Sequence, residues 1–157
     1  MTDHDEHQGL DEQLSELLQE LRVALPGVQI LLAFLFVVPF NTGFAQLDQS
    51  DRDVLFVAVT CAAFATVLMI APSAHHRFAW PLGPRGLRLL VRIATLETRV
   101  GMILMGIAIA ASFFVVSKVI LGSAAGLPAV LGVGIAIAAL WLGLPLWTRR
   151  SDHPDRR

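Results

Sequence analysis

Four long apolar stretches constrain this chain more than any other feature of its sequence. They run over residues 23–44, 54–71, 100–121 and 127–147. A helix needs about 20 apolar residues to cross the hydrocarbon core of a bilayer. None of the four stretches has the alternating polarity of a strand, and lipid offers the backbone no hydrogen-bond partners, so each must be a helix. The sequence therefore predicts an all-α, polytopic membrane protein with four transmembrane helices.

Composition agrees with one membrane domain over residues 1–157. The charged fraction is 16%, whereas soluble domains carry about 25%. The net charge of −1 does not favour nucleic acid as a partner. A cleaved signal peptide at residues 23–44 is disfavoured, because a long acidic segment precedes it where a short basic one is typical. The single cysteine, Cys61, excludes an intrachain disulfide.

Arginine placement predicts how the chain is oriented in the plasma membrane. With four spans, residues 1–22, the loop between the second and third spans and residues 148–157 share one side. That side carries ten arginines, and the other side carries only Arg52 and Lys118. The positive-inside rule therefore places the N- and C-termini in the cytoplasm. The ten arginines are Arg22, Arg77, Arg85, Arg88, Arg92, Arg99, Arg149, Arg150, Arg156 and Arg157.

The acidic residues 1–22 predict an amphipathic cytoplasmic helix. Leucines recur there at helical spacing while acids occupy the other positions. The pair Pro26-Gly27 predicts a bend between this helix and the first span. The leucines are Leu10, Leu14, Leu17, Leu18, Leu21 and Leu25.

A second cytoplasmic helix is expected between Pro84 and Val100. Its arginines fall on one stripe, with Leu87, Leu90 and Ala94 on the other side. Two interpretations stay open: a basic stripe facing solvent or lipid headgroups, or a clamp in which the stripe pairs with the acidic N-terminal helix. The stripe consists of Arg85, Arg88, Arg92 and Arg99.

The two outer loops are short. Residues 50–53 are expected to cap the second span. Residues 122–126 predict a tight hairpin, with Pro128 in the first turn of the helix that follows. The third and fourth spans should therefore pack antiparallel.

Charged groups inside the spans are the usual sign of an ion pathway, and the sequence places none there. Glu97 is expected just before the third span, and Lys118 at the outer interface with its ammonium snorkelling to water. Gln29 is the most informative polar residue, because a buried amide needs a partner. It predicts either a hydrogen bond between helices or a polar pathway.

Nothing in the sequence predicts catalysis or cofactor binding. Adjacent histidines such as His75 and His76 point in different directions and do not form a metal site. A headgroup contact or a pH-sensitive contact is the expectation for them. No nucleophile–base set or phosphate loop is present, so we expect no enzyme activity, no metal site and no cofactor.

Several short motifs resemble a bacterial family of small four-helix integral membrane proteins of unknown function. The motifs are residues 20–29 (ELRVALPGVQ), 38–40 (VPF) and 70–78 (IAPSAHHRF). Some members of that family carry a sodium:proton antiporter label, but the buried carboxylate that such exchange requires is not expected here. The resemblance implies a cluster of functional or structural positions in the bacterial inner membrane. Its members are Glu20, Arg22, Pro26, Gln29, Pro39, Pro72, His76 and Arg77.

The sequence thus favours a membrane-embedded interaction or accessory bundle. Its expected partners are the lipid bilayer and either further copies of itself or a larger membrane complex. The alternative is a small oligomeric channel or transporter for a cation or proton, with a pathway past Gln29. An ion pair of Glu20 with Arg77, or of Glu16 with Arg22, is a further hypothesis.

Overall fold

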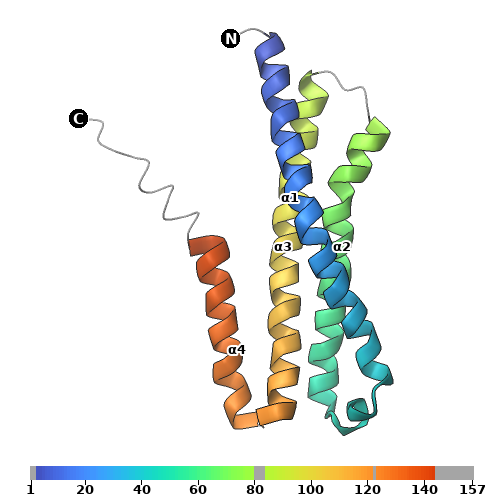
Figure 1. Cartoon of the computed structure of the whole chain (residues 1–157), viewed down its shortest axis with the longest axis vertical. Helices are drawn as coiled ribbons and strands as arrows, with labels where there is room; N and C mark the ends of the chain where they lie inside the picture. Colours follow the sequence, from blue (N-terminus) through green and yellow to red (C-terminus); the bar gives the residue numbers. More distant parts are fainter. Residues whose placement is uncertain (1–2, 80–83, 122, 144–157) are drawn as a thin grey trace, which may run out of the picture.

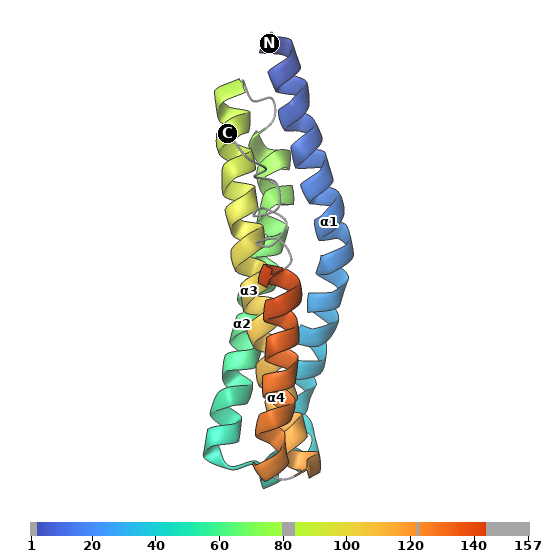
Figure 2. The ribbon, with the colours of Figure 1, turned by 90° about the vertical axis from the view of Figure 1, so that its left-hand side faces the viewer.

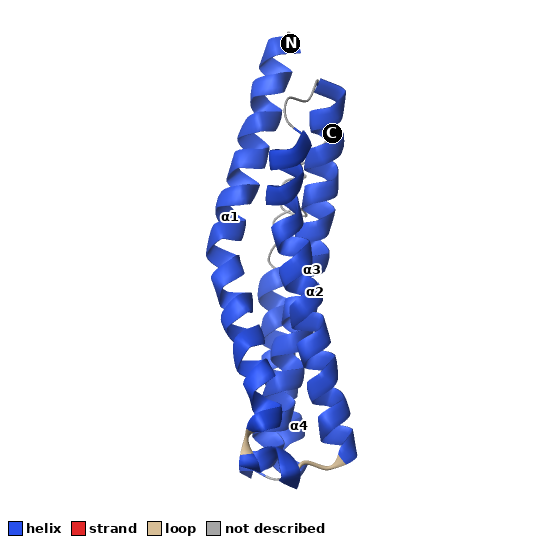
Figure 3. Cartoon of the chain, turned by 90° about the vertical axis from the view of Figure 1, so that its right-hand side faces the viewer, coloured by secondary structure: helices blue, strands red, loops and turns tan. Residues whose placement is uncertain are grey.

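A computed structural model of the chain describes residues 3–79, 84–121 and 123–143, and every regular element within these ranges is helical (Figure 3). The helices are α1 (Asp3–Val37), α2 (Gln49–Ala79), α3 (Pro84–Leu121) and α4 (Ser123–Ala138). Two 3₁₀ turns, η1 (Val38–Phe40) and η2 (Thr42–Gln46), connect α1 to α2. A single π-helical turn, η3 (Ala139–Gly143), follows α4.

The four helices form an elongated up-and-down bundle (Figure 1). Helices α1, α2 and α3 contact one another, whereas α4 contacts α3 alone among the described helices. Figure 2 shows α4 lying along the outer half of α3. The start of α1, the end of α2 and the start of α3 lie at one end of the bundle, which we call the inner end. The α1–α2 connection, the end of α3 and the start of α4 lie at the opposite, outer end.

Three helices are long and apolar enough to cross a membrane: Gln8–Phe40, Gln49–His75 and Arg85–Ile120. They suggest a multi-pass membrane protein. The apolar part of α4, Val130–Trp141, is shorter. The prediction of four spans with two additional cytoplasmic helices is therefore wrong.

The extra cytoplasmic helices are instead continuous with their spans. Helix α1 runs through Pro26, and α3 runs from Pro84 across Glu97 to Leu121. A proline removes one backbone hydrogen bond but leaves the bonds on either side of it. Neither glycine nor proline separates the basic segment of α3 from its apolar segment, so nothing ends that helix at the membrane boundary.

The connection from α3 to α4 also differs from the expected hairpin. Helix α4 begins at Ser123, so most of the predicted loop over residues 122–126 is helical. The antiparallel packing of α3 and α4 is confirmed (Figure 1). Residue 122, the last residues of the predicted fourth span and the basic segment 148–157 lie outside the described residues.

The core comprises three apolar clusters stacked along the bundle. At the inner end, Leu14 of α1 packs against Leu87, Leu90 and Ala94 of α3. The acidic and basic segments thus lie together, with buried leucines between them. All four arginines of the stripe are exposed. The middle cluster is Leu21, Val28, Ala65 and Met69, and the outer one is Leu35, Leu47, Leu55, Ala58, Ala62, Ala108 and Val115.

Small residues let α2 and α3 approach closely. Ala58, Ala62 and Ala65 on α2 are fully buried. A Cβ built on Gly101 of α3 would lie only 2.9 Å from Cγ of Met69. In lipid, where the hydrophobic effect does not drive helices together, such close backbone packing is a main source of association.

Charged residues mark the two edges of the apolar zone. Lys118 follows Glu97 by 21 positions on α3, which is about 32 Å of helix. Arg99 is the only charged residue between them. The hydrocarbon core of a bilayer is about 30 Å thick, which is close to the separation of Glu97 and Lys118 along α3. Large apolar side chains such as Phe34, Phe56 and Ile107 face outward within this zone.

Replacing Gly101 tests the close approach of α2 and α3. We expect Gly101→Leu to destabilise the bundle by about 1–3 kcal/mol, because the added side chain overpacks the interface with Met69. The midpoint of thermal unfolding in mild detergent measures the effect. Gly27→Leu on α1 is the matched control, since nothing lies within 4 Å of a Cβ built there. Equal midpoints for the two variants would contradict the close packing.

Candidate functional site

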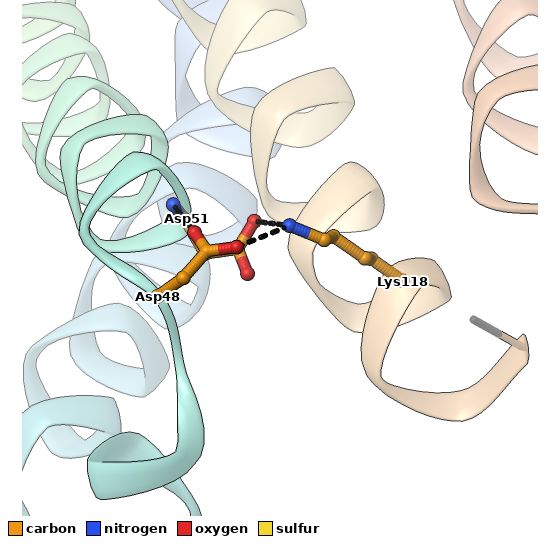
Figure 4. A network of polar contacts seen from close by, with 3 residues as sticks. All are labelled: Asp48, Asp51 and Lys118. Carbon is orange, nitrogen blue, oxygen red and sulfur yellow. Dashed lines mark hydrogen bonds and ion pairs between the residues drawn. The ribbon is translucent and has the colours of Figure 1, made fainter. Parts of the chain in front are cut away.

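A cluster of charged side chains joins α2 to α3 at the outer end (Figure 4). The Nζ atom of Lys118 donates to Oδ2 of Asp48 at 2.9 Å and to Oδ1 of Asp51 at 2.7 Å. The side chain of Asp51 is only 7% exposed and that of Lys118 is 25% exposed. We call these three residues the outer clasp.

Asp48 begins α2 as well as binding Lys118. Its Oδ1 accepts a hydrogen bond from the backbone N–H of Asp51 at 2.9 Å. This is the N-cap arrangement, in which a carboxylate satisfies a backbone donor that the first turn leaves unpaired. The cap predicted at residues 50–53 is therefore misplaced, since α2 begins at Gln49.

The interpretation of Lys118 as a merely snorkelling lysine is wrong, because it is held by two carboxylates. The hydrogen bond from Lys118 lowers the pKa of Asp48, and the bond from the Asp51 backbone lowers it further. A negative charge on Asp48 also interacts favourably with the N-terminus of α2. All three groups thus favour the ionised form of Asp48.

Arg52 of α2 contacts the α1–α2 connection. Its guanidinium donates to the backbone carbonyl of Ala45 at 3.4 Å and lies 5.0 Å from the ring centroid of Phe44. Cation–π contacts of this length are favourable. The α1–α2 connection is therefore held at both η2 and the clasp.

A second polar contact joins α2 and α3 at the inner end. Nδ1 of His75 lies 3.6 Å from Oε2 of Glu97, which is too long for a hydrogen bond. Oε2 of Glu97 and Oγ1 of Thr98 are both buried with no hydrogen-bond partner in the structure. Glu97 was expected before the third span, yet it lies within α3 and faces α2. We call His75 and Glu97 the inner pair.

The cluster implied by the resemblance lies mainly on outward surfaces. Glu20, Arg22, Pro26 and Gln29 are exposed along α1, Pro39 is exposed in η1, and Arg77 is exposed near the end of α2. Pro72 is buried inside α2. The side chain of His76 lies outside the described part of the structure.

Neither hypothesised ion pair is present among the described residues. Glu20 does not pair with Arg77, nor Glu16 with Arg22. Gln29 faces away from the interior of the bundle, so within one chain it lines no pathway.

Three hydroxyl groups of the spans are satisfied within their own helices. Thr60 donates to the carbonyl of Phe56, and Thr66 to that of Ala62. Ser112 on α3 bonds to Ala108 in the same way. Such bonds, four residues back along the helix, need no partner helix. These three side chains therefore do not form a polar path between helices.

Residues 3–145 match the model of a family of unknown function, DUF6328, and the chain belongs to that family. The family description carries no antiporter label. No curated protein and no solved structure matches the chain. Within the described residues, no group of three or more His, Cys, Asp and Glu side chains is arranged to hold a metal ion.

Removing the cation tests the outer clasp. We expect Lys118→Met to lower the midpoint of thermal unfolding in detergent by several degrees, because the buried carboxylate of Asp51 loses its partner. Lys118→Arg keeps the positive charge, so its midpoint should fall by less. The double variant Asp51→Asn/Lys118→Met should recover part of the loss. Equal midpoints for the wild type and Lys118→Met would contradict the assignment.

The stabilisation that the outer clasp contributes should depend on pH. Since Lys118 lowers the pKa of Asp48 in the folded state, the resulting stabilisation is full above the ordinary carboxyl pKa. It is lost as pH falls through the lowered value, below about pH 4. Lys118→Met should lack this acid-sensitive component.

Proposed function

We propose that this protein is a non-enzymatic, membrane-embedded interaction or accessory bundle. The observation that supports it most is an uncovered apolar strip on α3. Leu89, Ile93 and Leu96 are 60%, 39% and 62% exposed, although they precede Glu97 and so lie towards the inner side of the apolar zone. Exposed apolar side chains outside the hydrocarbon are typical of protein interaction sites. We call these three residues the α3 strip.

The partner of the α3 strip would be a helix of another protein or a second copy of this chain. Arg92 is exposed beside the strip on the same helix, so an amphipathic helix with acidic residues would complement it. The opposite side of α3 is already occupied, because Leu87 and Leu90 are buried against α1.

The orientation proposed from the arginines places this strip in the cytoplasm. Arg77 is near the end of α2 and three further arginines lie in the first third of α3, towards the inner end, whereas Arg52 and Lys118 lie towards the outer end. We therefore propose that the inner end is cytoplasmic and that both termini are on that side of the plasma membrane.

A photo-crosslinking amino acid at Ile93 tests the interaction role in native membranes. We expect a discrete adduct of one mass, either twice that of the chain or that of one partner. Its yield should fall several-fold in the variant Leu89→Ser/Leu96→Ser. The control position is Val23 on α1, which is 81% exposed and should give no such adduct. Lipid adducts alone at Ile93, or the same pattern at both positions, would overturn the proposal.

The second candidate is a small channel or transporter, and the inner pair is the observation that favours it. Glu97 has a buried carboxylate oxygen without a hydrogen bond, and the imidazole of His75 lies 3.6 Å from it. Because Gln29 is exposed, a pathway past it would run between copies of the chain.

Flux in proteoliposomes separates the two candidates. With imposed potassium, sodium and pH gradients, the interaction role predicts no ion or proton movement above empty vesicles. Transport predicts flux that falls by at least half in Glu97→Gln if the inner pair carries it, or in Gln29→Leu if the pathway lies on α1. Ser15→Ala, on an exposed part of α1 away from both residues, is the control.

A further inference from the structure

A groove of about 420 Å³ lies between α3 and α4. It is lined by apolar side chains from both helices, among them Ile103, Ile107, Ile137 and Trp141. Among the residues that the structure describes, Arg99 is the only charged one that lines it. Since α4 contacts no described helix other than α3, neither α1 nor α2 covers the groove.

Two glycines form part of the groove. A Cβ built on Gly106 would lie 3.2 Å from Cγ2 of Ile137 and 3.4 Å from Cζ3 of Trp141, so α3 and α4 are closest there. Gly134 on α4 has nothing within 4 Å of an added Cβ. The missing side chain at Gly134 therefore leaves space that a larger residue would fill.

The length of the groove matches one leaflet of a bilayer. Along α3 its lining runs from Arg99 to Ala110, which is 11 residues or about 16 Å of helix. Half of the hydrocarbon core is about 15 Å. Because Arg99 lies two residues beyond Glu97, at the inner edge of the apolar zone, the groove extends from that interface to the midplane.

Positive charge gathers at the inner mouth of the groove. Arg99 also borders a second hollow of about 480 Å³, on the inner part of α3, that Arg88 and Arg92 line as well. Successive residues of a helix are about 100° apart, so these arginines lie on the same face of α3 as Gly106 and Ala110. Nearer the outer end, Gly106 and Ala110 face α4. One face of α3 is thus basic near the inner interface and apolar from there towards the midplane.

We propose that this groove binds one anionic phospholipid from the leaflet at the inner end. Its phosphate is held by Arg99 and Arg92, and one acyl chain lies along Gly106, Ile107 and Trp141 towards the midplane. Basic groups beside a cleft between helices at the cytoplasmic face are typical of anionic lipid sites. A polypeptide in the groove would need its own backbone hydrogen bonds satisfied at this depth, whereas an acyl chain has none.

The π-helical turn η3 supports a ligand at this place. It contains Trp141 and follows directly on α4. Single π-helical turns are rare and are frequent at functional sites. The large indole ring offers a flat apolar surface against which an acyl chain can pack.

Quenching of Trp141 fluorescence by brominated lipids tests the proposal. The full-length chain with Trp80→Phe and Trp147→Phe retains only this tryptophan. It is reconstituted in vesicles of phosphatidylcholine in which either phosphatidylglycerol or an equal fraction of phosphatidylcholine is brominated. We expect brominated phosphatidylglycerol to occupy the site about fivefold more favourably (about 1 kcal/mol).

Variants of the two parts of the site should behave differently. Arg99→Gln with Arg92→Gln should remove the preference for the anionic lipid and leave quenching by phosphatidylcholine. Gly134→Leu should reduce quenching by both lipids, because it fills the groove. Arg22→Gln, an exposed arginine on α1, is the matched control and should leave the preference unchanged.

Three results would overturn the proposal. Equal quenching by the two lipids in the parent chain would show that the groove does not select for charge. A preference that survives the double arginine variant, or is lost equally in Arg22→Gln, would show that it arises from general surface charge. Absence of quenching by either lipid would show that a protein, such as a second copy of the chain, covers the groove.

Discussion

The close pairing of α2 with α3 is the interaction on which the rest of the structure depends. Fully buried alanines of α2 and Gly101 of α3 bring the two backbones together over the apolar zone. Because lipid removes most of the hydrophobic driving force, contact between small residues must supply much of the association. Helix α1 packs on this pair from one side, and α4 packs on α3 from another.

Polar contacts at both ends of the pair define its register. At the outer end Lys118 binds Asp48 and Asp51, and at the inner end His75 faces Glu97. A shift of one helix along the other would separate these residues at both ends of the pair. The outer clasp is the stronger contact, since its two distances are those of charge-assisted hydrogen bonds. In the inner pair the distance between the two side chains is longer, and one buried oxygen has no hydrogen-bond partner. The inner pair therefore contributes less than the outer clasp to holding α2 against α3.

The helical, membrane-type character of the chain could be predicted from the sequence, but the limits of its helices could not. Long apolar runs without alternation leave helix as the one solution in lipid. By contrast, the extent of a helix beyond the bilayer depends on which partner covers it. Leu14 and Leu87 stabilise continuous extensions of α1 and α3 by burying one another, and a hydropathy pattern within one segment does not reveal a contact between two.

The outer clasp was missed for a similar reason. Asp48, Asp51 and Lys118 each looked like an ordinary residue of a membrane interface when taken singly. A signal was nevertheless present, because an up-and-down arrangement brings the start of the second span and the end of the third to the same interface. The positions taken from the family resemblance, such as Glu20 and Gln29, are exposed. Their environment is set by whatever surrounds the bundle, which a single chain does not contain.

The placement of α3 in the membrane is the central claim, and a spin-label scan of its exposed face tests it most directly. In a Cys61→Ala background, single labels would replace Leu96, Ile103, Ile107, Val116 and Ile120, which are all exposed. Collisions with oxygen and with a membrane-impermeant nickel chelate added outside sealed, right-side-out vesicles would report depth and side. We predict that the label at Ile107 is deepest, that those at Leu96 and Ile120 lie near opposite interfaces, and that the chelate reaches Ile120 but not Leu96. A depth that increases steadily towards Leu96, or chelate access at Leu96 from outside, would contradict the account.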